Sequence, residues 1–189
     1  MSVSTKERIE QLGEKLLLTV GYNGFSYHDI SKALGIKNAA IHYHFPKKEQ
    51  LGIEIIANAR ERFRKSLESL ASLGCSYPEQ LTRFIKGAYD IHLKQPIELC
   101  EVGAVTSHFN TVPFGVKEHI QLMAEDIRSW LIELLHAGRN SNQLCYEGSP
   151  EDRATLIIST MVGALQIARI MGIQQYFKIK DQLIADLTV

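Results

Sequence analysis

The sequence contains few cysteines, no long apolar run and no net charge. Its 189 residues include three cysteines, which are Cys75, Cys100 and Cys145. An odd number at such wide separations does not suggest a disulfide framework or a CxxC metal site. The chain has no apolar stretch of the roughly 18 or more residues that a membrane-spanning helix needs, and its start lacks a secretory signal pattern. We therefore expect a cytoplasmic protein with reduced thiols and no contact with a membrane.

Signatures of catalysis are missing as well. The sequence shows no glycine-rich nucleotide loop, no nucleophile elbow and no paired-histidine metal motif. We therefore expect neither an enzyme nor a bound cofactor nor a metal site. A helical enzyme remains an alternative, because the seven scattered histidines can still act as acids and bases.

The zero net charge hides an asymmetry along the chain. Residues 1–65 carry 11 Lys and Arg against 7 Asp and Glu, which gives 11 − 7 = +4. Residues 66–189 carry 10 against 14, which gives 10 − 14 = −4. A basic N-terminal part joined to an acidic remainder is typical of a modular DNA-binding protein, although a difference of this size also arises by chance.

Apolar residues recur at helical spacing along almost the whole chain, and long alternating β patterns are missing. The first helix should bury Ile9, Leu12, Leu16 and Val20 on one face. Together with capping residues and breakers, the spacing predicts an all-α fold with helices over about 5–20, 27–34, 38–44, 48–73, 78–94, 97–109, 115–139, 150–171 and 173–187.

The stretch 26–45 predicts two short helices joined by a sharp turn. Ser26 with Asp29 forms a capping box, Gly35 suits a turn with positive φ, and Pro46 ends the second helix. Such a pair is a helix-turn-helix, whose second helix fits the major groove of DNA. Apolar side chains should lock the two helices together and face inward, namely Ile30, Ala33, Leu34, Ile36, Ile41 and Phe45.

This stretch resembles the TetR family of regulators, and more faintly the branch with LmrA-like and YxaF-like members. The matching residues are Ser26, Ile30, Gly35, Ala40, His44, Phe45, Lys48, Glu49 and Leu51, preceded by the turn Gly21-Tyr22-Asn23-Gly24-Phe25. The resemblance implies an N-terminal three-helix helix-turn-helix domain over residues 1–47, within a family module of about 5–65. It also implies a C-terminal helical domain over residues 48–189 for effector binding and dimerisation.

The resemblance and the chemistry of the side chains imply a set of DNA contacts. Phosphate contacts are expected from hydroxyl, imidazole and ammonium groups, and base contacts from polar groups and small apolar ones. The first group is Ser26, Tyr43, His44 and Lys48, and the second is Lys37, Asn38, Ala39, Ala40 and His42. Tyr27 is also expected to contact DNA. Lys37, Ala39 and His42 depart from the family pattern, and His44 has an equal alternative as a packed side chain.

Two further sites are predicted in the C-terminal part. The helix over 150–171 is apolar around a wide surface, so Ile157, Ile158, Met161, Val162, Leu165, Ala168 and Ile170 should form a homodimer interface, unless they are buried within one chain. The family implies a pocket for a small apolar effector, with candidate lining residues Tyr89, His92, Cys100, His108, Phe109, Phe114, Met123, Trp130, Gln166 and Met171. Ordinary core packing is the alternative for each of them.

The function predicted from the sequence is a transcriptional regulator. It would act as a repressor that binds a palindromic operator as a dimer and is released by a small molecule. Two alternatives remain beside a helical enzyme: a DNA-binding protein of this kind without a small-molecule ligand, and a helical interaction protein that has lost DNA binding.

Overall fold

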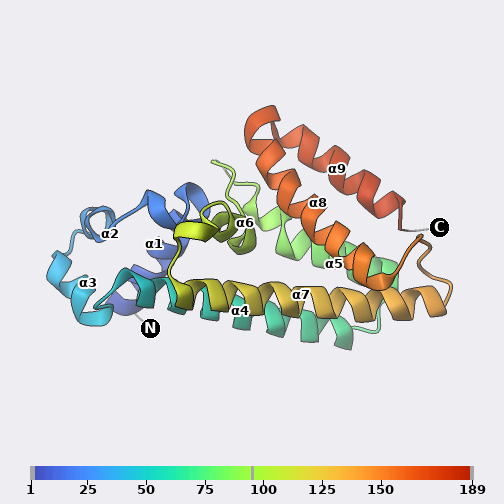
Figure 1. Cartoon of the computed structure of the whole chain (residues 1–189), viewed down its shortest axis with the longest axis horizontal. Coiled ribbons are helices and arrows are strands. Elements are labelled where there is room, and N and C mark those ends of the chain that lie inside the picture. Colours follow the sequence, from blue (N-terminus) through green and yellow to red (C-terminus); the bar gives the residue numbers. More distant parts are fainter. Residues whose placement is uncertain (1–2, 95, 188–189) are drawn as a thin grey trace. The chain divides into compact units, whose positions relative to one another are not determined.

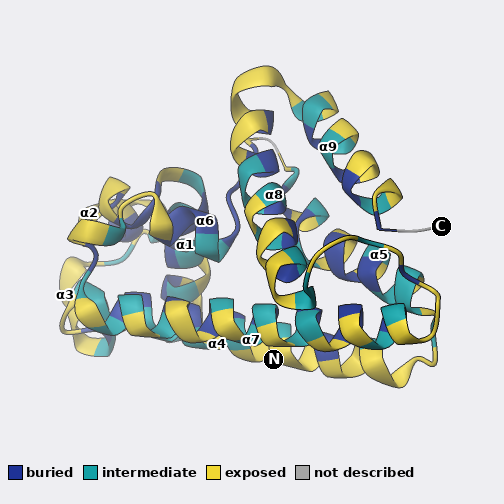
Figure 2. Cartoon of the chain, turned by 45° about the vertical axis from the view of Figure 1, so that its right-hand side comes forward, coloured by how far each residue is buried: buried dark blue, intermediate teal, exposed yellow. Residues whose placement is uncertain are grey.

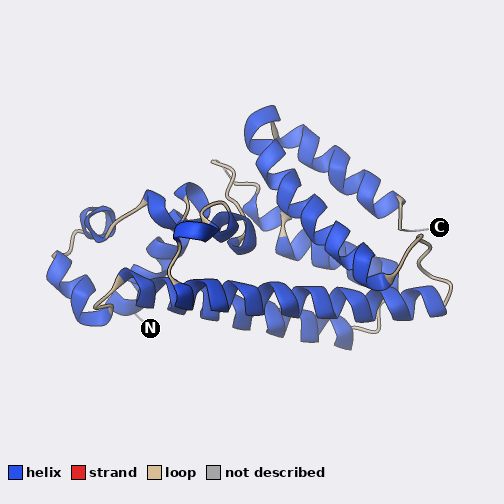
Figure 3. Cartoon of the chain, in the orientation of Figure 1, coloured by secondary structure: helices blue, strands red, loops and turns tan. Residues whose placement is uncertain are grey.

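Helices make up most of the structure, a computed structural model that describes residues 3–94 and 96–187 (Figure 3). No strand occurs within these residues, which confirms the all-α prediction. The helices are α1 Thr5–Val20, α2 Tyr27–Leu34, α3 Asn38–His44, α4 Lys48–Ser72, α5 Tyr77–Ala88, α6 Glu101–Thr106, α7 Phe114–Asn140, α8 Pro150–Met171 and α9 Ile173–Ala185. Short 3-10 turns are η1 Tyr22–Gly24, η2 Asp90–His92 and η3 Phe109–Thr111.

The chain forms two compact units that interleave in sequence. The first contains residues 1–61 and 101–123, and the second contains residues 62–100 and 124–189. The helices α4 and α7 therefore contribute residues to both units. The predicted functional division at residue 47 concerns which part binds DNA and which binds an effector, and it stays a prediction.

In the first unit, α1 packs against α2, α3 and α6. Its buried residues are Ile9, Gly13, Leu17 and Leu18, whereas Val20 is 46% exposed. Leu12 and Leu16 are partly buried, so the predicted face of Ile9, Leu12, Leu16 and Val20 was wrong at Val20 and is not fully buried at the two leucines. The reason is Gly13, which admits Leu51 and Ile55 of α4 so closely that an added Cβ would lie 3.0 Å from Ile55 Cδ1.

The caps that the sequence predicts for this unit are present. Ser4 and Glu7 close a capping box at α1, and Ser26 and Asp29 close one at α2. The C-cap Gly35 has φ 65° and ψ 32°, which is the left-handed region that glycine adopts most easily. The turn between α2 and α3 thus depends on this residue.

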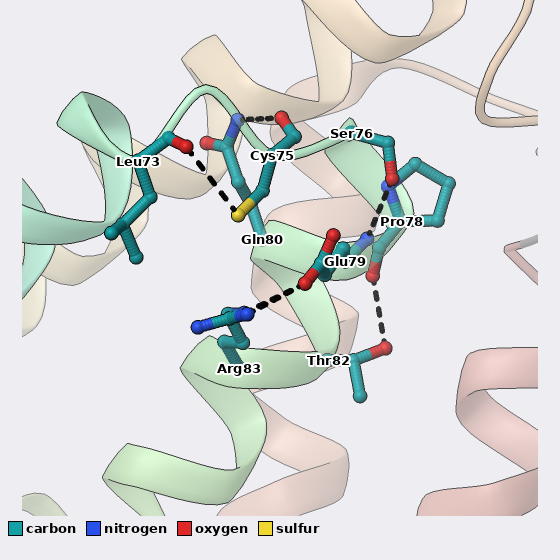
Figure 4. A network of polar contacts seen from close by, with 8 residues as sticks. All are labelled: Leu73, Cys75, Ser76, Pro78, Glu79, Gln80, Thr82 and Arg83. Atoms are coloured by element: carbon teal, nitrogen blue, oxygen red, sulfur yellow. Dashed lines mark hydrogen bonds and ion pairs between the residues drawn. The ribbon is translucent and has the colours of Figure 1, made fainter.

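Within the second unit, a short turn joins α4 to α5 (Figure 4). Gly74 has φ 64° and ends the helical path after Ser72. Ser76 Oγ then accepts from Glu79 N at 3.4 Å, and Gln80 Nε2 donates to the Cys75 carbonyl at 2.9 Å. The first bond satisfies a backbone N–H that the start of α5 leaves open, and the second ties the Cys75 carbonyl of the turn to α5. The junction is thus built by side chains next to the glycine.

The predicted helices over 78–94 and 97–109 were too long. The first ends at Ala88 and the second covers only Glu101–Thr106. Between them the chain turns through η2 and closes a loop in which Glu98 N donates to the His92 carbonyl at 2.9 Å. Pro96 prevents a helix from continuing through this loop, and the Asp90 side chain at its start is bonded to α9.

Helices α8 and α9 lie side by side in the second unit (Figures 1 and 2). By length and composition α8 passes as a membrane-spanning helix, as core helices of soluble proteins also do, and 33% of its apolar window is buried. This property was not predicted from the sequence. Its exposed apolar residues include Leu156, Ile170 and Met171, and Figure 2 shows the end of α8 next to α9 as exposed.

Replacement of Gly35 tests the turn that joins α2 and α3. We expect Gly35→Ala to destabilise the protein by about 1 kcal/mol, because alanine is strained in the left-handed region. Gly35→Asn should cost less, since asparagine tolerates that region better. Gly87 lies in α5 with open space around its missing Cβ, so Gly87→Ala should instead stabilise. Denaturant midpoints at one protein concentration measure all three, and a neutral Gly35→Ala would contradict the account.

Candidate functional site

Helix α3 has one buried side and one exposed side. Ile41 is 0% exposed, and Phe45, which follows the helix, is 3% exposed. On the other side Asn38, Ala39 and His42 are exposed, and Tyr43 is 83% exposed. The helix therefore presents polar and aromatic side chains outward while its apolar side is fixed in the first unit.

The turn before α3 is held from within α2. Ile30 is fully buried, and Ile36 N donates to the Ser31 carbonyl at 3.1 Å across Gly35. Leu34 and Ile36 are partly buried, whereas Ala33, which was predicted to face inward, is exposed. Lys37 occupies the N-cap of α3 without a side-chain bond to the helix, and its side chain is exposed. Lysine has no acceptor for such a bond, so its ammonium group stays available to another partner.

Ser26 is bonded internally at the start of α2. Its backbone N and its Oγ both donate to Asp29 Oδ2 at 2.7 Å. These bonds lower the pKa of Asp29, so its carboxylate is charged at neutral pH. A negative group at a helix N-terminus is favourable for the helix, but it repels a phosphate. The predicted phosphate contact of Ser26 stays a prediction, and the structure gives Ser26 a capping role besides.

Tyr27 and His42 form a small contact between α2 and α3. Tyr27 Oη donates to the Phe45 carbonyl at 2.8 Å, and its ring lies edge-on to the His42 ring with centroids 4.9 Å apart. Burial raises the pKa of Tyr27 to about 12, so the phenol keeps its proton. His42 Nδ1 lies 3.4 Å from the Pro46 carbonyl. Both side chains thus stiffen the end of α3, and their contacts with DNA stay predictions.

The side chains of Tyr43 and His44 touch each other at the end of α3, with ring centroids 5.1 Å apart. His44 is partly buried, which is compatible both with packing and with a contact at the edge of the site. Ala40 is also partly buried, so of the two predicted small residues Ala39 is the more accessible.

Lys48 is engaged inside the first unit. Its Nζ donates to the Tyr22 carbonyl at 2.6 Å and to the Phe25 carbonyl, and it lies 4.1 Å from the centroid of the Phe25 ring. Burial lowers the pKa of Lys48, and the Asp29 carboxylate opposes this. An ammonium group has three N–H donors. Two of them hold the turn after α1, so one remains for the predicted phosphate.

Several contacts of this site could not be predicted from local sequence. Asn23 Nδ2 donates to Thr111 Oγ1 at 2.6 Å, and a Cβ added at Gly21 would lie 2.9 Å from His108 Cδ2. Thr111 and His108 follow Asn23 by more than 80 positions. The segment 101–123 therefore supports the helix-turn-helix from outside it, and no pattern in residues 26–45 signals this.

The predicted interface residues of α8 divide into two groups. Ile157, Met161, Leu165 and Ala168 are at most 1% exposed within the single chain. Ile158 and Val162 are partly buried, and Ile170 is 81% exposed. The first group packs within the second unit, so for these residues burial within one chain is confirmed. A contact with a second chain stays a prediction.

The predicted pocket residues fall into both units. His108, Phe109, Phe114 and Met123 belong to the first. The second contains Tyr89, His92 and Cys100, which are buried, Trp130, which is partly buried, and Gln166 and Met171, which are exposed. Phe114 is 78% exposed and Met171 is 62% exposed in the single chain. Whether any of these residues lines a ligand pocket stays a prediction.

Aromatic rings cluster in the second unit. The ring centroid of Phe84 lies 5.9 Å from Phe63, 6.0 Å from Tyr89 and 5.1 Å from Trp130. These residues come from α4, α5, the end of α5 and α7. Within residues 3–94 and 96–187, no group of three or more His, Cys, Asp or Glu side chains is arranged to hold a metal ion.

Comparison with known proteins finds TetR regulators both by sequence and by structure. Residues 11–55 match the family model described as bacterial regulatory proteins, tetR family. A TetR transcriptional regulator from Legionella pneumophila is 29% identical over 100% of both chains, with a TM-score of 0.89. A TetR family regulator from Agrobacterium tumefaciens is 26% identical over 97% of both chains, with a TM-score of 0.91.

A more distant structure shares the fold. It is a transcriptional regulator from Saccharomonospora viridis in complex with choline, 16% identical over 97% of both chains, with a TM-score of 0.77. No curated protein is significantly similar in sequence.

Replacement of Lys48 separates its internal role from a role on DNA. Lys48→Met keeps the length of the stem and removes the ammonium group. We expect the midpoint of unfolding to fall, because two carbonyls lose their donor. We also expect DNA affinity to fall for all sequences alike. The slope of log affinity against log salt should become shallower by about 0.9 for each phosphate that the variant no longer neutralises.

Lys178→Met is the matched control for this test, because Lys178 is an exposed lysine of α9. It removes one positive charge outside the site and should leave the midpoint and the salt slope unchanged. A Lys48→Met protein that is less stable but keeps the full salt slope would restrict Lys48 to its internal role.

Proposed function

We propose that the chain is a DNA-binding transcriptional regulator of the TetR family, and that it represses transcription by binding a palindromic operator as a homodimer. A small apolar effector releases it from the DNA. The observation that carries the DNA-binding part is the exposed side of α3, where Asn38, Ala39 and Tyr43 project from a helix anchored by Ile41 and Phe45.

The contacts with DNA follow from this face. A helix lying in the major groove reads base edges with its outward side chains and touches phosphates at its ends. Asn38 pairs with a base edge, and Ala39 meets a thymine methyl. The ammonium group of Lys37, which makes no bond to α3, contacts another base edge. Tyr43 and the remaining N–H of Lys48 contact phosphates. Residues 1–47 thus carry DNA binding, and residues 48–189 carry dimerisation and effector binding.

One such helix covers too few base pairs for a specific site. A twofold dimer places two recognition helices roughly 34–36 Å apart, which is one turn of DNA. The exposed apolar residues of α8 support pairing through this helix, since Leu156, Ile167 and Ile170 lie on the side opposite Ile157, Met161 and Leu165. Gly163 lies on the same exposed side with open space around its missing Cβ, which permits close approach of a second helix.

The paired surface also accounts for the apolar composition of α8. An exposed apolar patch on a soluble protein marks an interaction site, and a dimer covers it as well as a membrane would. We therefore place the protein in the cytoplasm, where its DNA is.

Effector release rests on linkage between the two units. Residues of α4 belong to both of them, from Lys48 beside the helix-turn-helix to Phe63 in the aromatic cluster. A ligand that prefers a dimer with wrongly spaced recognition helices weakens operator binding by at most its differential affinity for the two states. The regulator in complex with choline supports a ligand site in this fold.

Selection of bound duplexes from a random pool tests the proposed operator. The selected sequences should contain two inverted half-sites whose centres lie about one helical turn apart. Asn38→Ala should then relax the preference at one base pair of each half-site, losing about 1–3 kcal/mol of discrimination there. Selected sequences without symmetry would contradict the dimeric mode, and an unchanged preference in Asn38→Ala would remove that contact.

A charged side chain at Gly163 tests the dimer interface. Because a Cβ there meets open space within the chain, Gly163→Glu should keep the monomer folded, yet it buries an unpaired charge if α8 pairs. We expect monomers in sedimentation and a loss of operator affinity of at least tenfold. Gly87→Glu is the control, since Gly87 also lies in a helix with open space. A dimeric Gly163→Glu protein would exclude this face.

A further inference from the structure

The turn η2 of the second unit carries two polar side chains, Asp90 and His92. Of these, Asp90 forms hydrogen bonds with side chains of α9. Asp90 Oδ1 accepts from Tyr176 Oη at 2.6 Å, and its Oδ2 accepts from Lys180 Nζ at 3.0 Å. Lys180 is 7% exposed and the Asp90 side chain is 27% exposed, so this ion pair is partly shielded from water. Charged hydrogen bonds of this kind are strong, and they fix η2 against α9.

His92, two residues further along the same turn, is in the opposite situation. It is 3% exposed, and neither Nδ1 nor Nε2 makes a hydrogen bond of good geometry. Burial lowers the pKa of His92 to about 4, although the Glu98 carboxylate opposes this shift. The imidazole is therefore neutral at pH 7 and offers one donor and one acceptor nitrogen. Leaving such groups unpaired is unfavourable for folding, which indicates that His92 serves a purpose other than stability.

The residues around His92 include buried apolar ones and the charged side chains of Glu98 and Lys94. Tyr89 and Cys100, at the two ends of the loop, are 3% and 6% exposed. Tyr89 is connected through Phe84 to the aromatic cluster with Trp130 and Phe63. Glu98 is 7% exposed and its side chain pairs with Lys94 Nζ at 3.4 Å. Apolar and aromatic residues together with a few polar groups are the usual composition of a small-molecule site.

We propose that His92 is the polar anchor of the effector site, and that the effector is an uncharged apolar molecule with a hydroxyl group. The proposal rests on the proposed effector-dependent regulation and makes it more specific. A hydroxyl group both donates and accepts, so it pairs with whichever imidazole nitrogen faces it. A carboxylate is disfavoured by the buried Glu98, and an ammonium group is disfavoured by loss of its hydration.

The thermal stability of His92→Phe gives the first test. If a buried polar residue is retained for binding at the expense of stability, its replacement by an apolar side chain should stabilise the free protein. We expect His92→Phe to raise the melting temperature by roughly 2–4 °C. His136→Phe, at an exposed position of α7, should leave it unchanged. A fall in the melting temperature of His92→Phe would show that His92 stabilises the fold and would overturn the proposal.

The second test compares para-cresol with toluene, which differ by one hydroxyl group, in calorimetric titrations of the full-length protein. We expect para-cresol to bind about tenfold or more tightly than toluene. In His92→Phe the two affinities should become equal. His92→Gln, which keeps a donor and an acceptor, should retain part of the preference, and His136→Phe should retain all of it.

Other outcomes of this titration contradict the proposal. Equal affinities in the wild-type protein, no binding of para-cresol, or a full preference in His92→Phe would each overturn the assignment of His92. Operator binding by the wild-type protein is measured in parallel. Its absence would overturn the proposed regulator function, whereas its presence without selectivity for para-cresol would overturn only the effector assignment.

Discussion

The shape of α3 depends on the packing of its apolar side. The helix has seven residues, and isolated helices shorter than about 12 residues are marginal in water. Ile41 and Phe45 therefore supply what the helix lacks by itself, because they are buried in the same unit as Ile30 and Leu51. A rigid inner side leaves the outer side chains at fixed positions, which recognition of base edges requires.

Polar side chains around α3 add to this rigidity. Ser26 and Asp29 close the start of α2, Tyr27 holds the Phe45 carbonyl, and Lys48 holds the turn after α1. Ser26, Tyr27 and Lys48, which are expected to contact DNA, thus also have internal partners. Pre-formed geometry reduces the entropy that is lost on binding, so the internal bonds favour the proposed DNA contacts as long as donors remain free for them.

Local features of the fold could be predicted from the sequence because their causes are local. The capping residues Ser4 and Ser26 and the turn at Gly35 act within a few positions of themselves. The buried face of α1 could not be predicted, because it depends on how closely α4 approaches Gly13. The irregular loop before α6 could not be predicted either, because Asp90 finds its partners Tyr176 and Lys180 more than 80 positions away.

The candidate site also has features that could be predicted from the sequence and features that could not. The exposed side of α3 follows from helical periodicity, and the exposure of Asn38 and Tyr43 agrees with it. The internal partners of Lys48 were not predicted, since they are backbone carbonyls that any residue provides. Likewise, nothing in the spacing of His92 indicates that its ring is buried without a hydrogen bond of good geometry.

Photo-cross-linking tests most directly whether α3 lies in the major groove. A photoreactive side chain in place of Ala39, on the exposed side of α3, is irradiated in the complex with a selected operator. The same group in place of the exposed Ala185, at the end of α9, is the reference. The account predicts cross-links from position 39 to bases of both half-sites and none from position 185. A complex that still forms but gives no cross-link from position 39 would contradict the account.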